Sequence, residues 1–285
     1  MNGFLNLYKP SGISSAQILN AIKKSIRRET IGHMGTLDPL ASGVLPVAIG
    51  KSTRLFDYLL DKDKEYIATI AFGYLTDTLD LEGNIVERSD AVPTREAIEN
   101  NARKLCGEIM QIPPAFSAKC VNGKRSYELA RKGKIVELPP KKVTINSIEI
   151  VDQTSDTEFK IKIDCKGGTY IRSIARDLGT LCGSCATMTS LVRTKSGVFD
   201  INDAVSCEDF VKSDNKESFI IKPENVVDYP ILNLTDNESE RLFNGLYDEF
   251  DFPDGTYRVF TPDKFYGVGE LKNKKLKVKA YLRDD

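Results

Sequence analysis

The chain has 285 residues, of which 41% are hydrophobic and 28% charged, a balance typical of a soluble globular protein with a sizeable core. No apolar run approaches the length that crosses a bilayer, and the opening residues MNGFLNLYKP lack the basic and apolar regions of a signal peptide. We therefore expect a cytoplasmic protein without a membrane partner, built from one large domain and one smaller domain.

The net charge of -1 conceals an uneven distribution. Residues 1–200 carry 28 Lys+Arg against 23 Asp+Glu, whereas residues 201–285 carry 12 against 18. Eight of the basic residues lie between positions 119 and 142. Such a cluster can neutralise phosphates, but it is equally typical of a solvated loop surface, and both interpretations stay open.

Six cysteines occur, and only Cys182 and Cys185 form a CxxC pair. With no second pair and no nearby histidine, a zinc site is not expected. A redox pair is conceivable, but reduced and mostly buried thiols are the preferred interpretation. We expect no metal and no cofactor.

The N-terminal segment predicts a short strand, a Pro-Ser-Gly turn and a helix. Ser14 or Ser15 is a suitable N-cap, and Ile18, Ile22 and Ile26 recur at helical spacing. These isoleucines are expected to face a core.

Residues 32–54, GHMGTLDPLASGVLPVAIGKSTR, contain the only histidine, His33, and an aspartate, Asp38, directly before a proline. Glycine and proline are costly inside helices and strands, and the residue before proline is held extended. One interpretation is a fixed loop that carries a carboxylate to a site. The other is a turn that leads into a buried strand, with Asp38 as a turn residue.

Residues 66–87 predict a strand, a polar turn and a second strand. Asp77, Asp80 and Glu82 lack the ordered ligand spacing of a hard-cation loop, so we interpret them as structural acids of the turn. A helix is expected over 94–107. Double prolines and dense basic residues then indicate an excursion from the core, with a short helix around 126–132.

Alternation of Phe159, Ile161 and Ile163 predicts a strand. We expect residues 170–172 to end that strand and a helix to start near Ser173, with Ile174, Leu178 and Leu181 on one face. Residues 223–230 are interpreted as a linker, and the segment after them predicts short strands with glycine turns.

The stretch GHMGTLDPLASGVLP resembles the catalytic motif of the TruB class of pseudouridine synthases. KPSGISS, TDTLDLEG and GTYIR resemble further motifs of that class, and Leu191 and Arg193 match a motif that closes over the target base. The resemblance implies an α/β (α+β) fold. Its catalytic domain over 1–228 would have a mixed, largely antiparallel sheet and a thumb-like insertion at about 112–142. A small PUA-like β-domain would follow over 229–285.

The resemblance also implies a reaction: isomerisation of a T-loop uridine of tRNA to pseudouridine. Asp38, Tyr66 and Arg172 are the implied catalytic residues, and an arginine beside Asp38 would favour the ionised carboxylate. Whether Asp38 attacks the ribose or the base is left open. Tyr66 would stack on the flipped base, typically worth about 1–3 kcal/mol, and take the C5 proton, although a phenol with a pKa of about 10 is a weak base at neutral pH.

The expected partner is the T-arm of tRNA, and the protein is expected to be a monomer with no obligate protein partner. The candidate substrate- or RNA-binding residues are His33, Leu191, Arg54, Lys9, Lys124, Arg125, Lys132 and Tyr170. Lys9 has the alternative interpretation of an ordinary exposed turn residue. Two other functions are alternatives: a synthase of a guide-RNA particle, and a non-catalytic chaperone that folds tRNA through the same arm.

Overall fold

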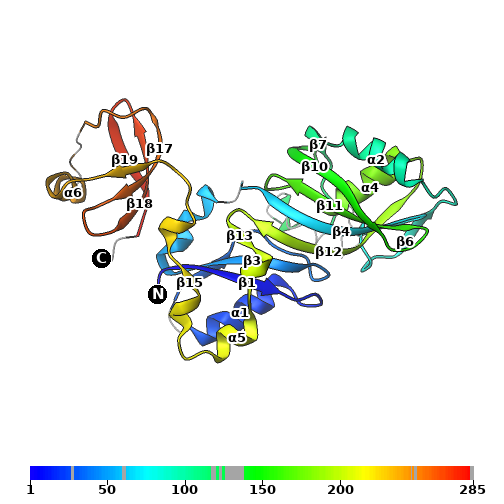
Figure 1. Ribbon diagram of the computed structural model, residues 1–285, viewed down its shortest axis with the longest axis horizontal. Coiled ribbons are helices and arrows are strands. Elements are labelled where there is room, and N and C mark those ends of the chain that lie inside the picture. Colours follow the sequence, from blue (N-terminus) through cyan, green and yellow to red (C-terminus); the bar gives the residue numbers. More distant parts are fainter. Residues whose placement is uncertain are drawn as a thin grey trace.

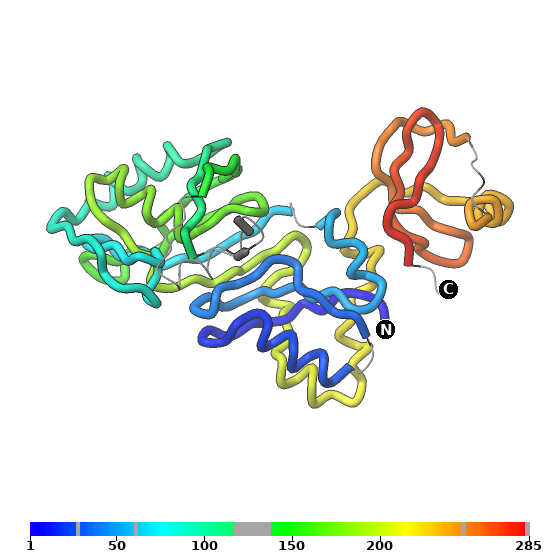
Figure 2. The backbone as a smooth tube through the Cα atoms, turned by 180° about the vertical axis from the view of Figure 1, so that it is seen from behind, coloured from blue at the N-terminus to red at the C-terminus, as the bar shows by residue number. Residues whose placement is uncertain are grey.

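The computed structural model describes residues 1–26, 29–59, 62–116, 120–121, 124–125, 138–244, 246 and 249–282. Figures 1 and 2 show a large two-part region and a separate C-terminal lobe. The large region corresponds to the catalytic domain that the resemblance implies, and it is called the catalytic region below. None of the helices in these ranges is long and apolar enough to cross a membrane. The short helix expected around 126–132 lies outside the described residues.

One large sheet forms the catalytic region. In sheet order its strands are β14 (Val205–Ser206), β1 (Gly3–Lys9), β3 (Ser42–Ile49), β12 (Ala186–Ser196), β4 (Lys64–Phe72), β11 (Glu158–Cys165), β10 (Lys141–Gln153) and β7 (Gly107–Gln111). Three short strands, β2 (Ile31–His33), β13 (Phe199–Asp200) and β15 (Ile220–Ile221), pair beside this path. The β1–β14 and β12–β3 pairs are parallel and the other pairs are antiparallel. The expected mixed, largely antiparallel sheet is confirmed.

Helices pack against both halves of this sheet (Figure 1). Helix α1 (Ser15–Ser25) and helix α5 (Cys207–Lys212) lie on the side of the sheet that contains β1 and β3. Helix α2 (Arg95–Lys104) and helix α4 (Ile171–Leu181) lie at the other end, near β10 and β11. Ser14 caps α1 in a capping box with Gln17, and Ile18 and Ile22 are buried, as the sequence predicts. Short 3-10 segments complete this region: η1 (Gly50–Tyr58), η2 (Ile201–Asp203) and η3 (Lys216–Phe219).

The expected boundary between β11 and α4 was wrong. The strand ends at Cys165, Gly168 turns the chain with a φ of 85°, and Tyr170 is already the N-cap of α4. Arg172 therefore lies in the first turn of the helix. Ile174 and Leu178 are buried as predicted, but Leu181 is 41% exposed because the helix ends there and the chain turns away at Gly183.

The acidic turn lies between β5 (Tyr74–Thr76) and β6 (Ile85–Arg88). Asp77 accepts a hydrogen bond from the Asn84 amide, while Asp80 accepts bonds from the Thr78 hydroxyl and the Glu82 amide. Satisfied carboxylates of this kind fix a turn, so Asp77 and Asp80 are structural acids as expected, although Asp80 also forms an ion pair with Arg172. For Glu82 the structural role stays a prediction. A second small hairpin joins β8 (Cys120–Val121) and β9 (Lys124–Arg125).

The C-terminal lobe is a four-stranded sheet with one helix. Its elements are β16 (Ile231–Asn233), α6 (Asp236–Phe243), β17 (Gly255–Phe260), β18 (Phe265–Lys272) and β19 (Lys275–Tyr281). Leu232, Val259, Leu271 and Leu276 form a core of its own. The small β-domain is thus present, and its likeness to a PUA domain stays an interpretation.

The segment 223–230, which we interpret as a linker, is packed in the structure. It contains η4 (Pro223–Asn225), and Val226 and Val227 are both buried. These valines belong to an apolar cluster that joins Met34 and Leu55 of the catalytic region to Val268 of the C-terminal sheet. Apolar packing therefore continues across the expected domain boundary at residue 228.

Candidate active site

The segment between β2 and β3 carries Asp38 and is held at several points. The Met34 amide donates to the Pro46 carbonyl at 2.8 Å, and the Ala41 amide donates to the Asp38 carbonyl at 3.0 Å. Ser15, the first residue of α1, bonds both backbone groups of Leu37 at 2.8 and 3.0 Å. The two interpretations of residues 32–54 are therefore both part of the structure: an anchored loop carries Asp38, and it leads into a buried strand.

Lys9 supports the loop that carries Asp38. The expectation that Lys9 is exposed or contacts RNA was wrong. The residue is fully buried, and its Nζ donates to the carbonyls of Pro10, Pro39 and Ala41 at 2.9, 3.2 and 2.6 Å. Burial lowers the pKa of Lys9 to about 8, with the Asp38 charge opposing the shift. Two of these acceptors, Pro39 and Ala41, fix the backbone on both sides of Leu40, and the third ties the loop to Pro10.

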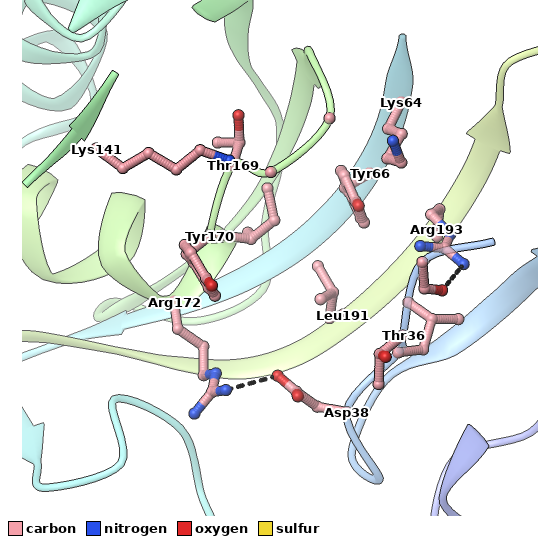
Figure 3. A pocket seen from close by; sticks show the side chains of 15 residues that line it. Thr36, Asp38, Lys64, Tyr66, Lys141, Thr169, Tyr170, Arg172, Leu191 and Arg193 are labelled. Carbon is pink, nitrogen blue, oxygen red and sulfur yellow. Dashed lines mark hydrogen bonds and ion pairs between the residues drawn. The ribbon is translucent and has the colours of Figure 1, made fainter. Parts of the chain in front are cut away.

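A cavity of about 430 Å³ opens above the loop and brings the three predicted catalytic residues together (Figure 3). Asp38 comes from the loop, Tyr66 from β4 and Arg172 from the start of α4. Tyr170 and Leu191, both predicted substrate contacts, line the same cavity. Segments distant in sequence thus converge on one site.

Arg172 makes the central ion pair of the cavity. Its Nη2 lies 2.9 Å from Oδ2 of Asp38, and its Nη1 lies 3.3 Å from Oδ2 of the buried Asp80. The guanidinium also donates to the carbonyls of Thr78 and Phe116, at 3.0 and 2.9 Å. Because the two Nη groups are also held by Asp80 and by two backbone carbonyls, Arg172 holds the Asp38 carboxylate in one orientation.

Tyr66 is 7% exposed and lies across the cavity from Arg172 (Figure 3). Burial raises the pKa of the Tyr66 phenol above its usual value, while the nearby Arg193 charge and a hydrogen bond from Arg193 oppose this shift. The hydroxyl is therefore protonated at neutral pH. A neutral phenol in this position can stack and accept or donate a hydrogen bond.

The remaining predicted RNA contacts lie elsewhere. His33 is half-buried on β2, outside the cavity lining, and its Nδ1 has no hydrogen-bond partner among the described residues. Burial, followed by the charge of Arg193, lowers the pKa of His33. Arg54 on η1 lies over the Tyr281 ring at 4.7 Å and donates to the Tyr281 carbonyl. For Lys124 and Arg125 only the backbone, in β9, is described, and Lys132 lies outside the described residues.

Three further residues belong to the site but not to the predicted catalytic and RNA-binding residues: Lys64, Asp80 and Arg193. From the sequence, Arg193 is predicted only as part of a motif that closes over the target base, and Asp80 only as a structural acid. Lys64 and Arg193 line the cavity, and Asp80 reaches it through Arg172. Lys64 lies two positions before Tyr66 on β4, so the alternation of a strand places both on one face, a signal that was available in the sequence. The position of Arg193 beside Tyr66 depends on strand register, which no local pattern reveals.

No group of three or more His, Cys, Asp or Glu side chains within the described ranges is arranged to hold a metal ion. The five cysteines whose side chains are described, Cys182 and Cys185 among them, are free thiols.

Comparisons with known proteins agree with this geometry. Residues 23–171 match the family model of the TruB family pseudouridylate synthase N-terminal domain, and residues 172–224 match the tRNA pseudouridylate synthase B C-terminal domain. The tRNA pseudouridine synthase B of Francisella philomiragia is 38% identical, covering 100% of this chain and 96% of that protein. Its counterpart from Clostridium tetani is 39% identical, covering 99% and 100%.

A solved structure of an H/ACA ribonucleoprotein bound to a substrate RNA containing 2′-deoxyuridine shares the fold, with a TM-score of 0.74 and 23% identity over 99% of this chain and 85% of that one. The fold and the family-model match define the class of protein as a pseudouridylate synthase. Within that class, the chain belongs to the TruB family.

Proposed function

We propose that the protein isomerises uridine to pseudouridine in the T-loop of tRNA. The observation that carries the proposal is the Asp38 carboxylate, 38% exposed at the cavity and aimed by Arg172, with Tyr66 facing the same space. The tRNA substrate is supported by the names of the full-length relatives, both called tRNA pseudouridine synthase B. We propose that the chain acts on tRNA without an obligate protein partner.

The reaction requires a uridine that has left its stack. Flipping the nucleotide out costs a few kcal/mol, which stacking on an aromatic ring partly offsets. Tyr66 and Leu191 supply an aromatic and an apolar wall for the base, and Tyr170 lies on the opposite side of the cavity. An enclosed space also retains the uracil once its glycosidic bond is broken.

Asp38 is the group suited to assist cleavage of the C1′–N1 bond, because a carboxylate can act as a nucleophile or stabilise positive charge on the sugar. The detached uracil then turns and C5 bonds to C1′. The C5 hydrogen leaves as a proton, and N1, which keeps the electron pair of the broken bond, takes up a proton. The net reaction neither gains nor loses atoms or electrons. Arg172 contributes by keeping Asp38 in one orientation throughout.

The first test is tritium release from a T-arm hairpin labelled at C5 of its uridines. Wild-type protein is expected to release tritium, and Asp38→Asn is expected to bind the hairpin with similar affinity and release none. The asparagine keeps the shape of the side chain but lacks the negative charge.

Release by Asp38→Asn near the wild-type rate would contradict the role of Asp38. Tight binding without release by the wild type would instead indicate a tRNA chaperone or another target uridine.

A further inference from the structure

The large sheet of the catalytic region has a narrow junction. Strands β1 and β3 pair through seven residue pairs, whereas β3 and β12 are joined in parallel through only two, Val192 with Ser42 and Arg193 with Gly43. Asp38 precedes β3 on one side of this junction. Tyr66 and Arg172 lie on the other side, with β4 and α4. The relative placement of the catalytic residues therefore depends on how this junction is held.

Residue 43 allows the close approach of the two strands. Gly43 has a φ of 103°, and a Cβ atom built there would lie 2.2 Å from the carbonyl oxygen of Arg193. Only glycine fits such a contact and such a backbone conformation. Arg193 is consequently fixed against the start of β3 by its backbone as well as by its side chain.

The Arg193 side chain reaches both ends of the loop that carries Asp38. Its Nε donates to the Val44 carbonyl at 2.7 Å, and its Nη2 donates to the Gly35 carbonyl at 3.1 Å. The residue is 1% exposed, so these charge-assisted bonds are made away from water. One rigid guanidinium thus sets the distance between the two ends of the loop.

The same side chain also meets the other side of the cavity. Arg193 is directly opposite Tyr66 in the β12–β4 register, and its positive charge opposes the rise that burial causes in the pKa of Tyr66. Figure 3 shows Arg193 between Tyr66 and the loop segment that contains Thr36. Its contacts therefore span from the Asp38 loop to the tyrosine.

We propose that Arg193 is a positioning residue for the isomerisation, which fixes the Asp38 loop relative to Tyr66 across the junction of the two half-sheets. The inference rests on the proposed function and adds a residue to it. Arg193 acts through the Gly35 and Val44 carbonyls and through Tyr66. A shift of about 1 Å in such a placement is enough to cost about 100-fold in rate.

The test uses single-turnover tritium release from the labelled T-arm hairpin, with enzyme titrated to give a maximal rate and a half-saturating concentration. The variants are Arg193→Met and Arg193→Lys. Lysine keeps the charge but lacks the planar fork that reaches two carbonyls at once. Arg258→Met is the matched control, because Arg258 similarly donates to two carbonyls, those of Tyr229 and Glu224, away from the cavity.

We expect the maximal rate to fall at least 100-fold in Arg193→Met and about 10-fold in Arg193→Lys, with half-saturation within threefold of wild type. Arg258→Met should keep both parameters within threefold, even where its melting temperature falls as far as that of Arg193→Met. A rate change confined to the maximal rate separates positioning from general loss of structure.

A maximal rate of Arg193→Lys within threefold of wild type would overturn the inference, and this variant decides the matter if Arg193→Met fails to fold. Equal rate losses in Arg193→Met and Arg258→Met at matched melting temperatures would also overturn it. Absence of release by the wild type itself would contradict the proposed function instead.

Discussion

Charged side chains are placed differently around the cavity and in the C-terminal sheet. Lys9, Lys64, Asp80, Arg172 and Arg193 are all buried near the cavity, whereas the buried side chains among the described residues 231–282 include no charged one. Burying a charge is costly unless fixed partners compensate for it. Burying charges around the cavity costs folding free energy but holds the side chains in fixed positions. In the C-terminal sheet the charged side chains stay in contact with water.

The largest expected effect of this difference is at Arg172. Arg172→Met leaves Asp80 buried without its cation and Asp38 without its guide, so we expect at least a 100-fold loss of tritium release. We also expect a loss of about 3 kcal/mol in the free energy of unfolding, as for other broken buried pairs. Urea denaturation and single-turnover assays measure the two effects. If Arg172→Met were as stable and active as wild type, the buried charges around the cavity would not be what fixes its geometry.

Lys9 provides a pH-dependent test. Its pKa is about 8 in the folded protein against 10.5 for an ordinary lysine, so between these values the unfolded chain binds more protons. The wild-type free energy of unfolding should therefore rise with pH through this window, by about 2 kcal/mol relative to Lys9→Met. Urea denaturation at pH 7.5 and pH 10 measures the difference, in which tyrosine titration common to both proteins cancels. Parallel pH profiles would show that the buried lysine has no such linkage.

A smaller effect is expected from the basic residues between positions 119 and 142. Replacing Lys124, Arg125, Lys132 and Lys134 by glutamine should weaken T-arm binding and make its logarithmic salt dependence shallower, by about 0.9 for each phosphate that the variant no longer neutralises. The matched control replaces Lys272, Lys275 and Lys277 of the C-terminal segment. An unchanged slope in the first variant and a shallower slope in the second would contradict the prediction. They would indicate that the C-terminal lysines, and not those of the insertion, contact the RNA.

The smallest effect is expected at Arg54, where the two regions meet. Its contact with Tyr281 is exposed, so Arg54→Ala should cost less than about 1 kcal/mol of unfolding free energy and leave the maximal rate unchanged. Thermal denaturation and tritium release measure this. A large rate loss would mean that Arg54 contacts RNA directly, as its place in the predicted set implies.

Local patterns predicted the elements that bury one face. The helix capped at Ser14, the alternating strand of Phe159 and Ile161, and the acidic turn at Asp80 follow from spacing and hydrogen-bonding capacity. Motif order predicted that Asp38, Tyr66 and Arg172 belong together, and the structure places all three at one cavity.

Long-range contacts explain what was missed. Lys9 stands in a polar Lys-Pro-Ser-Gly sequence typical of an exposed turn, yet carbonyls 30 and 32 positions later enclose it. Arg193 acquires its place from a strand register with Tyr66 and from Gly35, 158 positions earlier. Apart from the Pro10 carbonyl beside Lys9, these acceptors are far in sequence from the residues that use them.

The pairing of β1 has a consequence for biosynthesis. One edge of this first strand pairs with β3, whereas the other edge pairs with Val205 and Ile220, about 200 residues further along the chain. At a synthesis rate of roughly 5–20 residues per second, these partners follow β1 from the ribosome by roughly 10–40 s. During that interval the nascent chain carries an open strand edge, the kind of surface that templates aggregation, while Asp38 has already been made. We therefore expect the period of synthesis, more than the lifetime of the finished fold, to be when this chain depends on shielding by chaperones.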